Sequence, residues 1–253
     1  NEIGVPYFQE AEVRKALLMG IDRNRITSLL FNGQAIVANS VILPGTWAYN
    51  DQVPLVAYDP QGAADLLKNT GYVVSGETST VRAKDDVELS FVFSFPDDDL
   101  HLSIAQMIQE DWAEIGVKVE LEAVPPDVFV EQKLEPRAYQ AALIDLNLSQ
   151  TPDPDPYPFW DLGQAESGQN YSQWNNRLAS DSIEQARVTT DLAERLARGA
   201  GRYPPVDPEL LLTKGGARPG ARLVLTKPLG FGVTTTALKR EQAAPEDVAE
   251  VVA

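Results

Sequence analysis

Residues 87–124 place a strand, a helix and a second strand in direct succession, and this order constrains the fold more than any other feature. From residue 102 apolar residues recur at helical spacing up to Ile115, and Gly116 then supplies a left-handed stop. Period-two alternation returns in VKVELEAV, residues 117–124. A strand–helix–strand unit predicts an α/β architecture. The first strand is predicted from alternating apolar side chains, which mark one buried face: Val87, Leu89, Phe91, Phe93 and Phe95.

Helical signals dominate before this unit. The first 33 residues are typical of a pair of helices, the second capped by Asp22 and closed by Gly33. Residues 38–58 are rich in turn formers. The dipeptide at 59–60, Asp-Pro, then predicts the start of a further helix that ends at Gly71.

After the unit the chain is expected to continue as alternating elements. Residues 125–134 predict a short helix that opens on two prolines, and residues 138–148, AYQAALIDLNL, predict a buried strand. A last helix is expected with Ser180 or Asp181 as its cap, interrupted near residues 190–191.

Residues 151–176, TPDPDPYPFWDLGQAESGQNYSQWNN, are interpreted as an ordered recognition loop. Prolines occupy every second position from Pro152 to Pro158, and each removes a backbone donor, so no helix is expected. Long irregular segments are usually functional or disordered, and the frequent aromatic residues argue against disorder. The aromatic residues and the acids between them are Tyr157, Phe159, Trp160, Tyr171, Trp174, Asp153, Asp155 and Asp161.

Composition excludes several classes of chemistry. The 253 residues include no cysteine and one histidine, which excludes disulfides, thiolate nucleophiles and multi-histidine metal clusters. The net charge of −16 argues against nucleic acid as a partner, because phosphate binding requires a basic face. Apolar runs fall short of the roughly 18 residues that cross a bilayer. No signal segment opens the chain, so we expect that a signal was removed or that the start is missing.

The histidine and the acids near it are expected to be structural. Residues 97–99, three aspartates, are expected to cap the following helix, because a calcium loop would need a glycine and a distal glutamate. His101 is expected at the surface or in the first turn of that helix.

Charge divides the chain near residue 198. Residues 1–198 carry 14 Lys and Arg against 31 Asp and Glu, a net −17, whereas residues 199–253 carry 7 against 6, a net +1. Residues 199–206 are rich in glycine and proline. We therefore expect a domain over 1–198, a linker over 199–206 and a separate segment over 207–253.

Six segments occur in order across residues 10–198: VRKALLMGIDRNRI, ANSVILPGTWAYN, YDPQGAADLLKNTGY, IAQMIQEDWAEIGVKVELEAV, TPDPDPYPFW and NYSQWNN. In sequence and order they resemble family 5 of the solute-binding proteins that serve ABC importers of oligopeptides, dipeptides or nickel.

The resemblance implies a fold and a function. The family fold is a two-lobed clamp that buries its ligand between the lobes. This chain matches a partial periplasmic-binding-protein-like (class II) lobe, with a mixed sheet flanked by helices. The implied function is extracytoplasmic binding of a peptide or other small solute. The implied partners are the membrane subunits of an ABC importer, and the implied location is periplasmic or extracellular, lipid-anchored or soluble. Neither catalysis nor a cofactor or metal is implied.

The resemblance also implies ligand-contacting residues in the recognition loop. Asp153 or Asp155 would pair with the amino terminus of a peptide, and the alternative is that both aspartates begin turns. Asn170 would bond the ligand backbone, with turn formation as its alternative, and Trp47 is a weaker candidate. Four aromatic residues would line side-chain pockets or, alternatively, pack the loop onto the domain: Tyr157, Trp160, Tyr171 and Trp174.

Residues 207–253 resemble a middle fragment of selenophosphate synthetase, through LVLTKPLG, TTALKR and APEDVAE. The pattern predicts a short strand-turn-helix C-terminal appendage. Gly230 and Gly232 could cradle phosphate, but two glycines at a strand-to-helix turn are weak evidence, and a structural turn is the favoured interpretation. That family's catalytic cysteine or selenocysteine, its partner lysine and its glycine-rich motif lie upstream and do not occur here, so the activity is expected to be absent. The alternatives to a peptide-binding function are therefore that the chain is a fragment of such an enzyme or a non-functional chimera.

Overall fold

The computed structural model describes residues 5–40, 42–74, 79–147 and 154–191. The chain divides into two compact units, Asn1–Pro205 and Val206–Ala253, and every described residue belongs to the first. The predictions for the segment 207–253, Gly230 and Gly232 included, lie outside the described residues and stay predictions.

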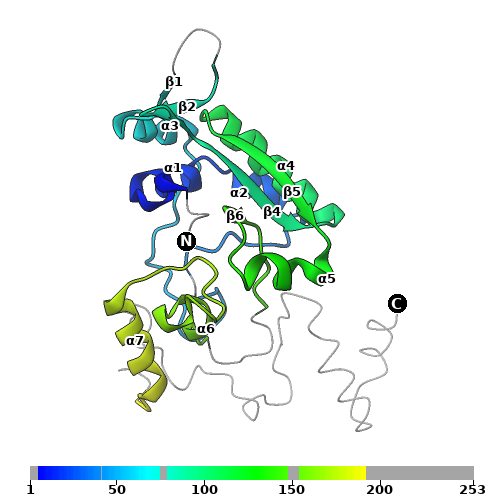
Figure 1. Ribbon diagram of the computed structural model, residues 1–253. Helices are drawn as coiled ribbons and strands as arrows, with labels where there is room; N and C mark the ends of the chain where they lie inside the picture. Colours follow the sequence, from blue (N-terminus) through cyan, green and yellow to red (C-terminus); the bar gives the residue numbers. More distant parts are fainter. Residues whose placement is uncertain (1–4, 41, 75–78, 148–153, 192–253) are drawn as a thin grey trace. The chain divides into compact units, whose positions relative to one another are not determined.

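Figure 1 shows the arrangement of the elements. They are η1 (Pro6–Gln9), α1 (Ala11–Met19), α2 (Arg23–Leu30), α3 (Pro60–Asn69), β1 (Val73–Val74), β2 (Arg82–Lys84), β3 (Val87–Glu88), β4 (Ser90–Pro96), α4 (Asp99–Glu114), β5 (Lys118–Val124), α5 (Pro126–Phe129), η2 (Val130–Leu134), β6 (Ala141–Ala142), α6 (Tyr157–Trp160), η3 (Leu162–Gln164) and α7 (Arg177–Val188).

The predicted strand–helix–strand unit is confirmed as β4–α4–β5. Strands β4 and β5 are parallel over their whole length, with Phe93 opposite Leu121, and β6 pairs with the other side of β4. Among the strands that the structure describes, the parallel sheet has the order β5-β4-β6, so β6 lies at its edge. A second, antiparallel sheet has the order β1-β2-β3. In Figure 1 helix α4 runs along β4 and β5, as expected of the crossover in such a unit.

The main core forms where α1, α4 and the parallel sheet meet. Phe91, Phe93 and Phe95 on β4 are all buried, as their alternation predicts. Trp112 on α4 packs edge-on against Phe91 and Phe93, with ring centroids 5.3 and 5.5 Å apart. Its indole Nε1 donates to the backbone oxygen of Leu17 at 2.9 Å, which fixes α4 to α1. One aromatic side chain thus joins the sheet to the N-terminal helices.

The start of the predicted first strand is corrected by the structure. Val87 belongs to the two-residue strand β3, which pairs antiparallel with β2, and its side chain is exposed. The buried strand begins only at Ser90. The apolar alternation runs on without a break because Leu89, between the two strands, is itself buried.

Helix starts follow the predicted caps in three places. Asp22 accepts from the backbone N–H of Arg25 at 2.9 Å, and Asp59 from Gly62 at 2.8 Å. Asp98 accepts from Leu100 and His101 at 3.1 and 3.0 Å. Three positive-φ glycines follow α2, α3 and α4 as predicted: Gly33, Gly71 and Gly116.

The last helix was predicted to begin too late. Helix α7 starts at Arg177, because Asn176 caps it by accepting from the backbone N–H of Ala179 at 3.1 Å. Ser180 and Asp181 therefore lie inside the helix. The helix ends at Val188, two residues before the predicted interruption.

Two predictions about the region after β5 are also wrong. A strand was expected over residues 138–148, and within the described part, residues 138–147, only the two half-buried residues of β6 form one. Within the proline-rich loop, α6 and η3 form short helical turns where no helix was expected. Pro156 is the N-cap of α6 and Pro158 lies in its first turn, where backbone N–H groups have no helical partner to lose.

None of the described helices is long and apolar enough to span a membrane.

Candidate functional site

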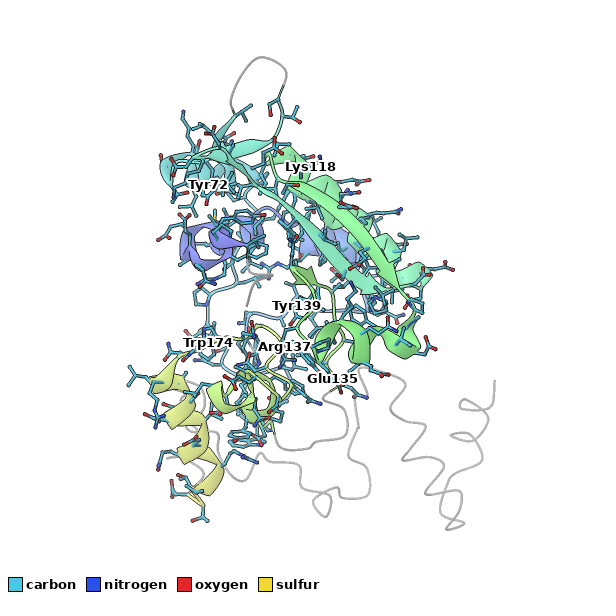
Figure 2. The ribbon with its side chains drawn as sticks, in the orientation of Figure 1. Tyr72, Lys118, Glu135, Arg137, Tyr139 and Trp174 are labelled. Carbon is cyan, nitrogen blue, oxygen red and sulfur yellow. The ribbon has the colours of Figure 1, made fainter. Side chains whose placement is uncertain are left out.

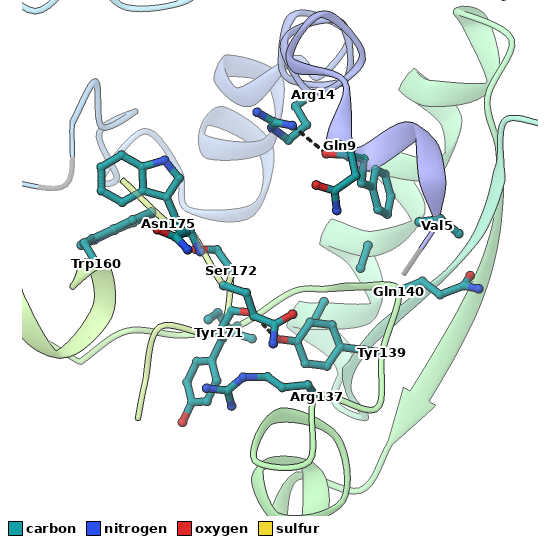
Figure 3. Close-up of a pocket in the computed structure, with 16 residues that line it drawn as sticks. Val5, Gln9, Arg14, Arg137, Tyr139, Gln140, Trp160, Tyr171, Ser172 and Asn175 are labelled. Carbon is teal, nitrogen blue, oxygen red and sulfur yellow. Dashed lines mark hydrogen bonds between the residues drawn. The ribbon is translucent and has the colours of Figure 1, made fainter. Parts of the chain in front are cut away.

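A cleft of about 710 Å³ lies among three segments that are far apart in the sequence. One wall comes from η1 and the start of α1, a second from residues 137–144 around β6, and the third from residues 160–175 of the proline-rich loop. Figure 3 shows these walls around the cleft. The lining residues are Val5, Phe8, Gln9, Arg14, Arg137, Tyr139, Gln140, Ala141, Ala142, Ile144, Trp160, Tyr171, Ser172, Gln173, Trp174 and Asn175.

Arg137 lines the cleft and contacts the proline-rich loop. It follows η2 with a positive φ of 58° and is only 6% exposed. Its guanidinium donates to the backbone oxygens of Ala165 at 3.1 Å and Gly168 at 2.7 Å, and it lies 4.9 Å from the ring centre of Tyr171. This one side chain therefore holds the proline-rich loop against the segment that follows β5.

Tyr139 makes a second link across the same join. Its hydroxyl donates a hydrogen bond to the backbone oxygen of Tyr171. Burial raises the pKa of Tyr139 above its usual value. Arg137, Tyr139 and Trp174 are labelled in Figure 2, where they lie near one another between the sheet and helix α6.

Asn170 is the fully buried centre of the loop. Its amide nitrogen donates to the backbone oxygens of Asp161 at 3.0 Å and Trp174 at 2.8 Å. Its amide oxygen accepts from the hydroxyl of Ser172 at 2.9 Å and the backbone N–H of Trp174 at 3.1 Å. The side chain thus shapes the turn, which is the alternative that the sequence left open, and its direct contact with a ligand stays a prediction.

Three of the predicted aromatic residues come together on the cleft. Trp160, Tyr171 and Trp174 all line it. The rings of Trp160 and Trp174 meet edge to face, with centroids 6.1 Å apart and planes at 79°. Trp174 remains 40% exposed, so it offers an apolar surface that the loop itself does not cover.

Asp155 and Tyr157 lie away from this cleft. A carboxylate oxygen of Asp155 is 3.0 Å from Nε of Arg187 on α7, and its other oxygen accepts from the backbone N–H of Tyr157 at 3.1 Å. The same arginine lies 4.1 Å over the ring of Tyr157. Asp155 and Trp47 line a separate hollow of about 20 Å³. Asp153 lies outside the described residues.

Sequence reasoning missed the cleft's other wall. Arg14 stands in the VRKALL motif and Arg137 and Tyr139 in PRAYQ, and neither motif suggested a site. The spacing of apolar residues in the sequence places such residues on helices and strands. That these three side chains meet at one cleft depends on how α1 and the proline-rich loop pack around β6. The available signal was that Arg137 and Tyr139 immediately precede the segment that leads into the loop.

Residues 2–169 match the sequence model of a family described as bacterial extracellular solute-binding proteins, family 5 Middle. The dipeptide-binding protein of Escherichia coli K12 is 27% identical over 189 residues, which cover 74% of this chain and 34% of that protein. The oligopeptide-binding protein AppA of Bacillus subtilis is 27% identical over 188 residues, covering 73% and 34%. This chain spans about a third of the length of these relatives.

Solved structures give the same result. The structure of AppA from Bacillus subtilis in complex with a nonapeptide superposes with a TM-score of 0.70 at 26% identity, over 78% of this chain and 39% of that one. NikZ from Campylobacter jejuni in complex with Ni(L-His) gives a TM-score of 0.68 at 25% identity, over 77% and 39%. The periplasmic-binding-protein-like (class II) fold is therefore shown for the part of the chain that these superpositions cover.

Proposed function

The chain belongs to family 5 of the bacterial extracellular solute-binding proteins, and from this membership we propose that its cleft contacts a peptide for an ABC-type importer. The observation that carries the proposal is the cleft itself, where an edge strand and an aromatic wall face the same space. Relatives named as peptide-binding proteins support it. The function is binding, without a catalytic step.

The lining suits a peptide backbone. Ala141 and Ala142 of edge strand β6 line the cleft, and an edge strand presents unpaired backbone groups to an added strand. Amide side chains lie beside them, among them Asn175 and Gln140, whose oxygen already accepts from the backbone N–H of Val92 at 2.7 Å. Amides both donate and accept, so they match the peptide group, which does the same.

The aromatic wall suits varied ligand side chains. Trp160, Tyr171 and Trp174 offer flat apolar surfaces whose contact does not depend on a single side-chain shape. From the family resemblance we also propose that Tyr157 lines a side-chain pocket, that Asn170 bonds the ligand backbone, and that Asp153 or Asp155 pairs with the ligand's amino terminus. Asp155 can do so only in competition with Arg187.

The wider role follows from the family. We propose that the whole protein delivers its solute to the membrane subunits of an ABC importer and works in the periplasm or outside the cell, lipid-anchored or soluble. Peptides are the first candidate ligand. A nickel chelate is the alternative, which the likeness to NikZ favours.

Titration calorimetry of the 253-residue chain with di- to pentapeptides tests the proposal. We expect heat of binding with at least one peptide. Trp174→Ala should weaken it about tenfold, because truncating an aromatic anchor usually costs more than about 1 kcal/mol. Leu178→Ala is the matched control, since Leu178 is 79% exposed and lies outside the cleft. Binding of Ni(L-His) without any peptide binding would replace peptides by nickel chelates, and no binding of either would contradict the proposal.

For residues 207–253 we infer a fragment of different origin, resembling selenophosphate synthetase and without its activity, joined to the binding segment through residues 199–206. The change of net charge from −17 before residue 199 to +1 after it supports this. Sequencing the source genomic DNA across residues 198–207 tests it. Two separate genes would confirm a joined product, whereas one continuous reading frame would contradict the inference.

A further inference from the structure

The chain contains ten asparagines, and one of them, Asn32, directly precedes a glycine. Asparagine is among the least durable residues in proteins, because the backbone nitrogen of the following residue can attack its side-chain amide. A glycine in that following position has no Cβ to hinder the approach and leaves the backbone free to turn. Of all the asparagines in the sequence, Asn32 therefore has the neighbour that makes this attack easiest.

The structure presents Asn32 and Gly33 in an open turn at the end of helix α2. Both residues are exposed, and both have positive φ, 50° and 71°. A Cβ at Gly33 would meet nothing within 4 Å, so the space around this glycine is free. None of the hydrogen bonds among the described residues involves the side chain of Asn32. Its amide group is therefore free to rotate toward the backbone nitrogen of Gly33.

One hydrogen bond opposes the attack. The backbone N–H of Gly33 donates to the backbone oxygen of Thr27 at 3.2 Å, the long-range bond of a Schellman turn at the carboxyl end of a helix. This bond belongs to the last turn of α2, and terminal turns open far more easily than the middle of a helix. The bond therefore slows the attack but does not prevent it.

Other asparagines are held or shielded where Asn32 is not. Side-chain hydrogen bonds hold Asn39 to Val53, Asn176 to the start of α7, and the buried Asn170 inside the proline-rich loop. Asn69 gives the nearest comparison, because it is also exposed and also lies at the end of a helix, α3. The residue that follows it is Thr70, whose branched Cβ crowds the backbone nitrogen. Asn69 is therefore expected to react more slowly.

We propose that Asn32 is a site of spontaneous deamidation, with solvent water as the co-reactant. The backbone nitrogen of Gly33 gives its proton to hydroxide and attacks Cγ of Asn32, and the new C–N bond closes a succinimide ring. The bond from Cγ to the side-chain nitrogen breaks, and this nitrogen takes a proton from water and leaves as ammonia. Water then adds to either ring carbonyl and opens the ring to aspartate or isoaspartate. No atom is oxidised or reduced in this sequence.

The modification changes the end of α2 and leaves its start in place. Both products add a negative charge at the carboxyl end of the helix, where the helix dipole disfavours it. Isoaspartate also lengthens the backbone by one carbon, so the bond from Gly33 to Thr27 loses its geometry. At the other end of α2 the backbone N–H of Asp22 and the guanidinium of Arg25 each bond Asp111 on α4 at 2.8 Å. We therefore expect the change to be confined to the last turn.

Peptide mapping by tandem mass spectrometry of the intact chain, incubated at pH 5 and at pH 8, tests the inference. Trypsin cuts after Arg25 and Lys68, so Asn32 and Asn69 fall in different peptides. We expect Asn32 to lose its amide about tenfold faster than Asn69, because glycine leaves the attacking nitrogen unhindered. The loss should be faster at pH 8 than at pH 5, since the nitrogen must first give up its proton.

Two glycine variants assign the reaction to the Asn32-Gly33 pair. Gly33→Ala should slow the loss of the amide about tenfold, because the new Cβ hinders the nitrogen. Gly45→Ala is the matched control, since Gly45 also has a positive φ, 87°, and open space around it, but no asparagine precedes it. It should leave the rate at Asn32 unchanged. If Asn32 is no faster than Asn69, or if the two glycine variants act alike, the inference is overturned. The proposed function does not enter this test and stands in either case.

Discussion

The carboxylate of Asp155 lies 3.0 Å from Nε of Arg187, and this ion pair fastens the start of the proline-rich loop to helix α7. The arginine also covers the ring of Tyr157. Asp155 is thus one of the two acids that the family resemblance assigns to a ligand's amino group, and the fold already supplies it with a cation. Any ammonium group that reaches it must compete with Arg187.

Arg187→Gln is expected to strengthen binding of peptides with a free amino terminus by about 2- to 5-fold, the equivalent of the ~0.5–1 kcal/mol of a partly exposed ion pair. The reason is that Asp155 loses its competing partner. N-acetylated versions of the same peptides should show no gain. Calorimetry of free and acetylated peptides with the variant and the native chain measures the difference. An equal effect on both forms would show that Asp155 does not meet the amino terminus.

Asn170→Ala is expected to lower the free energy of unfolding by about 2–4 kcal/mol, because it leaves buried backbone groups of Asp161 and Trp174 without partners. Chemical denaturation followed by tryptophan fluorescence measures the change. Asn175→Ala is the matched control. Asn175 is exposed in the same loop, none of the described hydrogen bonds involves its side chain, and its loss should change stability by less than about 0.5 kcal/mol. Equal effects of the two variants would contradict the structural role of Asn170.

The parts of the fold that local rules govern were predictable from the sequence. Asp22, Asp59 and Asp98 are caps because a short acidic side chain before a helix accepts from its free N–H groups, and this requires no knowledge of the rest of the chain. Phe91 and its alternate neighbours are buried because period two separates the two faces of a strand. The α/β order follows from these local signals.

The cleft was only half predictable, for a physical reason. Trp160 and Trp174 are large aromatic residues in a segment without regular structure, which makes them visible in the sequence. Arg14 is indistinguishable from any surface arginine on a helix until α1 is seen to face the loop. The ion pair of Asp155 was not predictable, because nothing local reveals that Arg187, 32 positions later, folds back onto it.

Gly116→Ala is expected to destabilise the chain more than Gly33→Ala. Both glycines have positive φ, 81° and 71°, so both variants incur the strain of a left-handed alanine, about 1–2 kcal/mol. A Cβ at Gly33 would meet nothing within 4 Å, whereas at Gly116 it would lie 2.8 Å from Cγ of Arg82. Arg82 cannot move away freely, because its guanidinium donates to the backbone oxygens of Ile115 at 2.8 Å and Tyr72 at 3.1 Å.

We therefore expect Gly116→Ala to cost at least about 1 kcal/mol more than Gly33→Ala, since overpacking in a filled site typically costs ~1–3 kcal/mol. Urea denaturation of the two variants measures the difference. The double change Gly116→Ala with Arg82→Ala should relieve the steric part, because it removes the side chain that the new methyl group meets. Equal destabilisation by both single variants would contradict the close packing of Arg82 on this turn.

His101 joins the start of α4 to the segment that leads into the proline-rich loop. Its Nδ1 lies 2.7 Å from Asp98 and its Nε2 lies 3.2 Å from Asp145, three residues after β6. The side chain is buried in the first turn of α4, so the expectation of a first-turn residue is confirmed and that of a surface residue is wrong. Asp98 thus serves both as a helix cap and as a partner of this buried imidazole.

The backbone N–H of His101 and, less strongly, its side chain hold the pKa of Asp98 below its usual value. A carboxyl whose pKa is lower in the folded than in the unfolded chain stabilises the fold above the unfolded pKa, about 3.9, and loses this contribution as pH falls through the folded pKa.

Asp98→Asn keeps a good cap but removes the charge. We expect Asp98→Asn to lower the melting temperature at pH 7 and to have progressively less effect as pH falls below about 4. Thermal unfolding by circular dichroism from pH 2.5 to pH 7 measures this. Asp97→Asn is the control, because it removes the same charge from an exposed neighbour that caps no helix, and its effect should be small at every pH. A melting-temperature difference for Asp98→Asn that is as large at pH 2.5 as at pH 7 would show that the charge of Asp98 does not stabilise the start of α4.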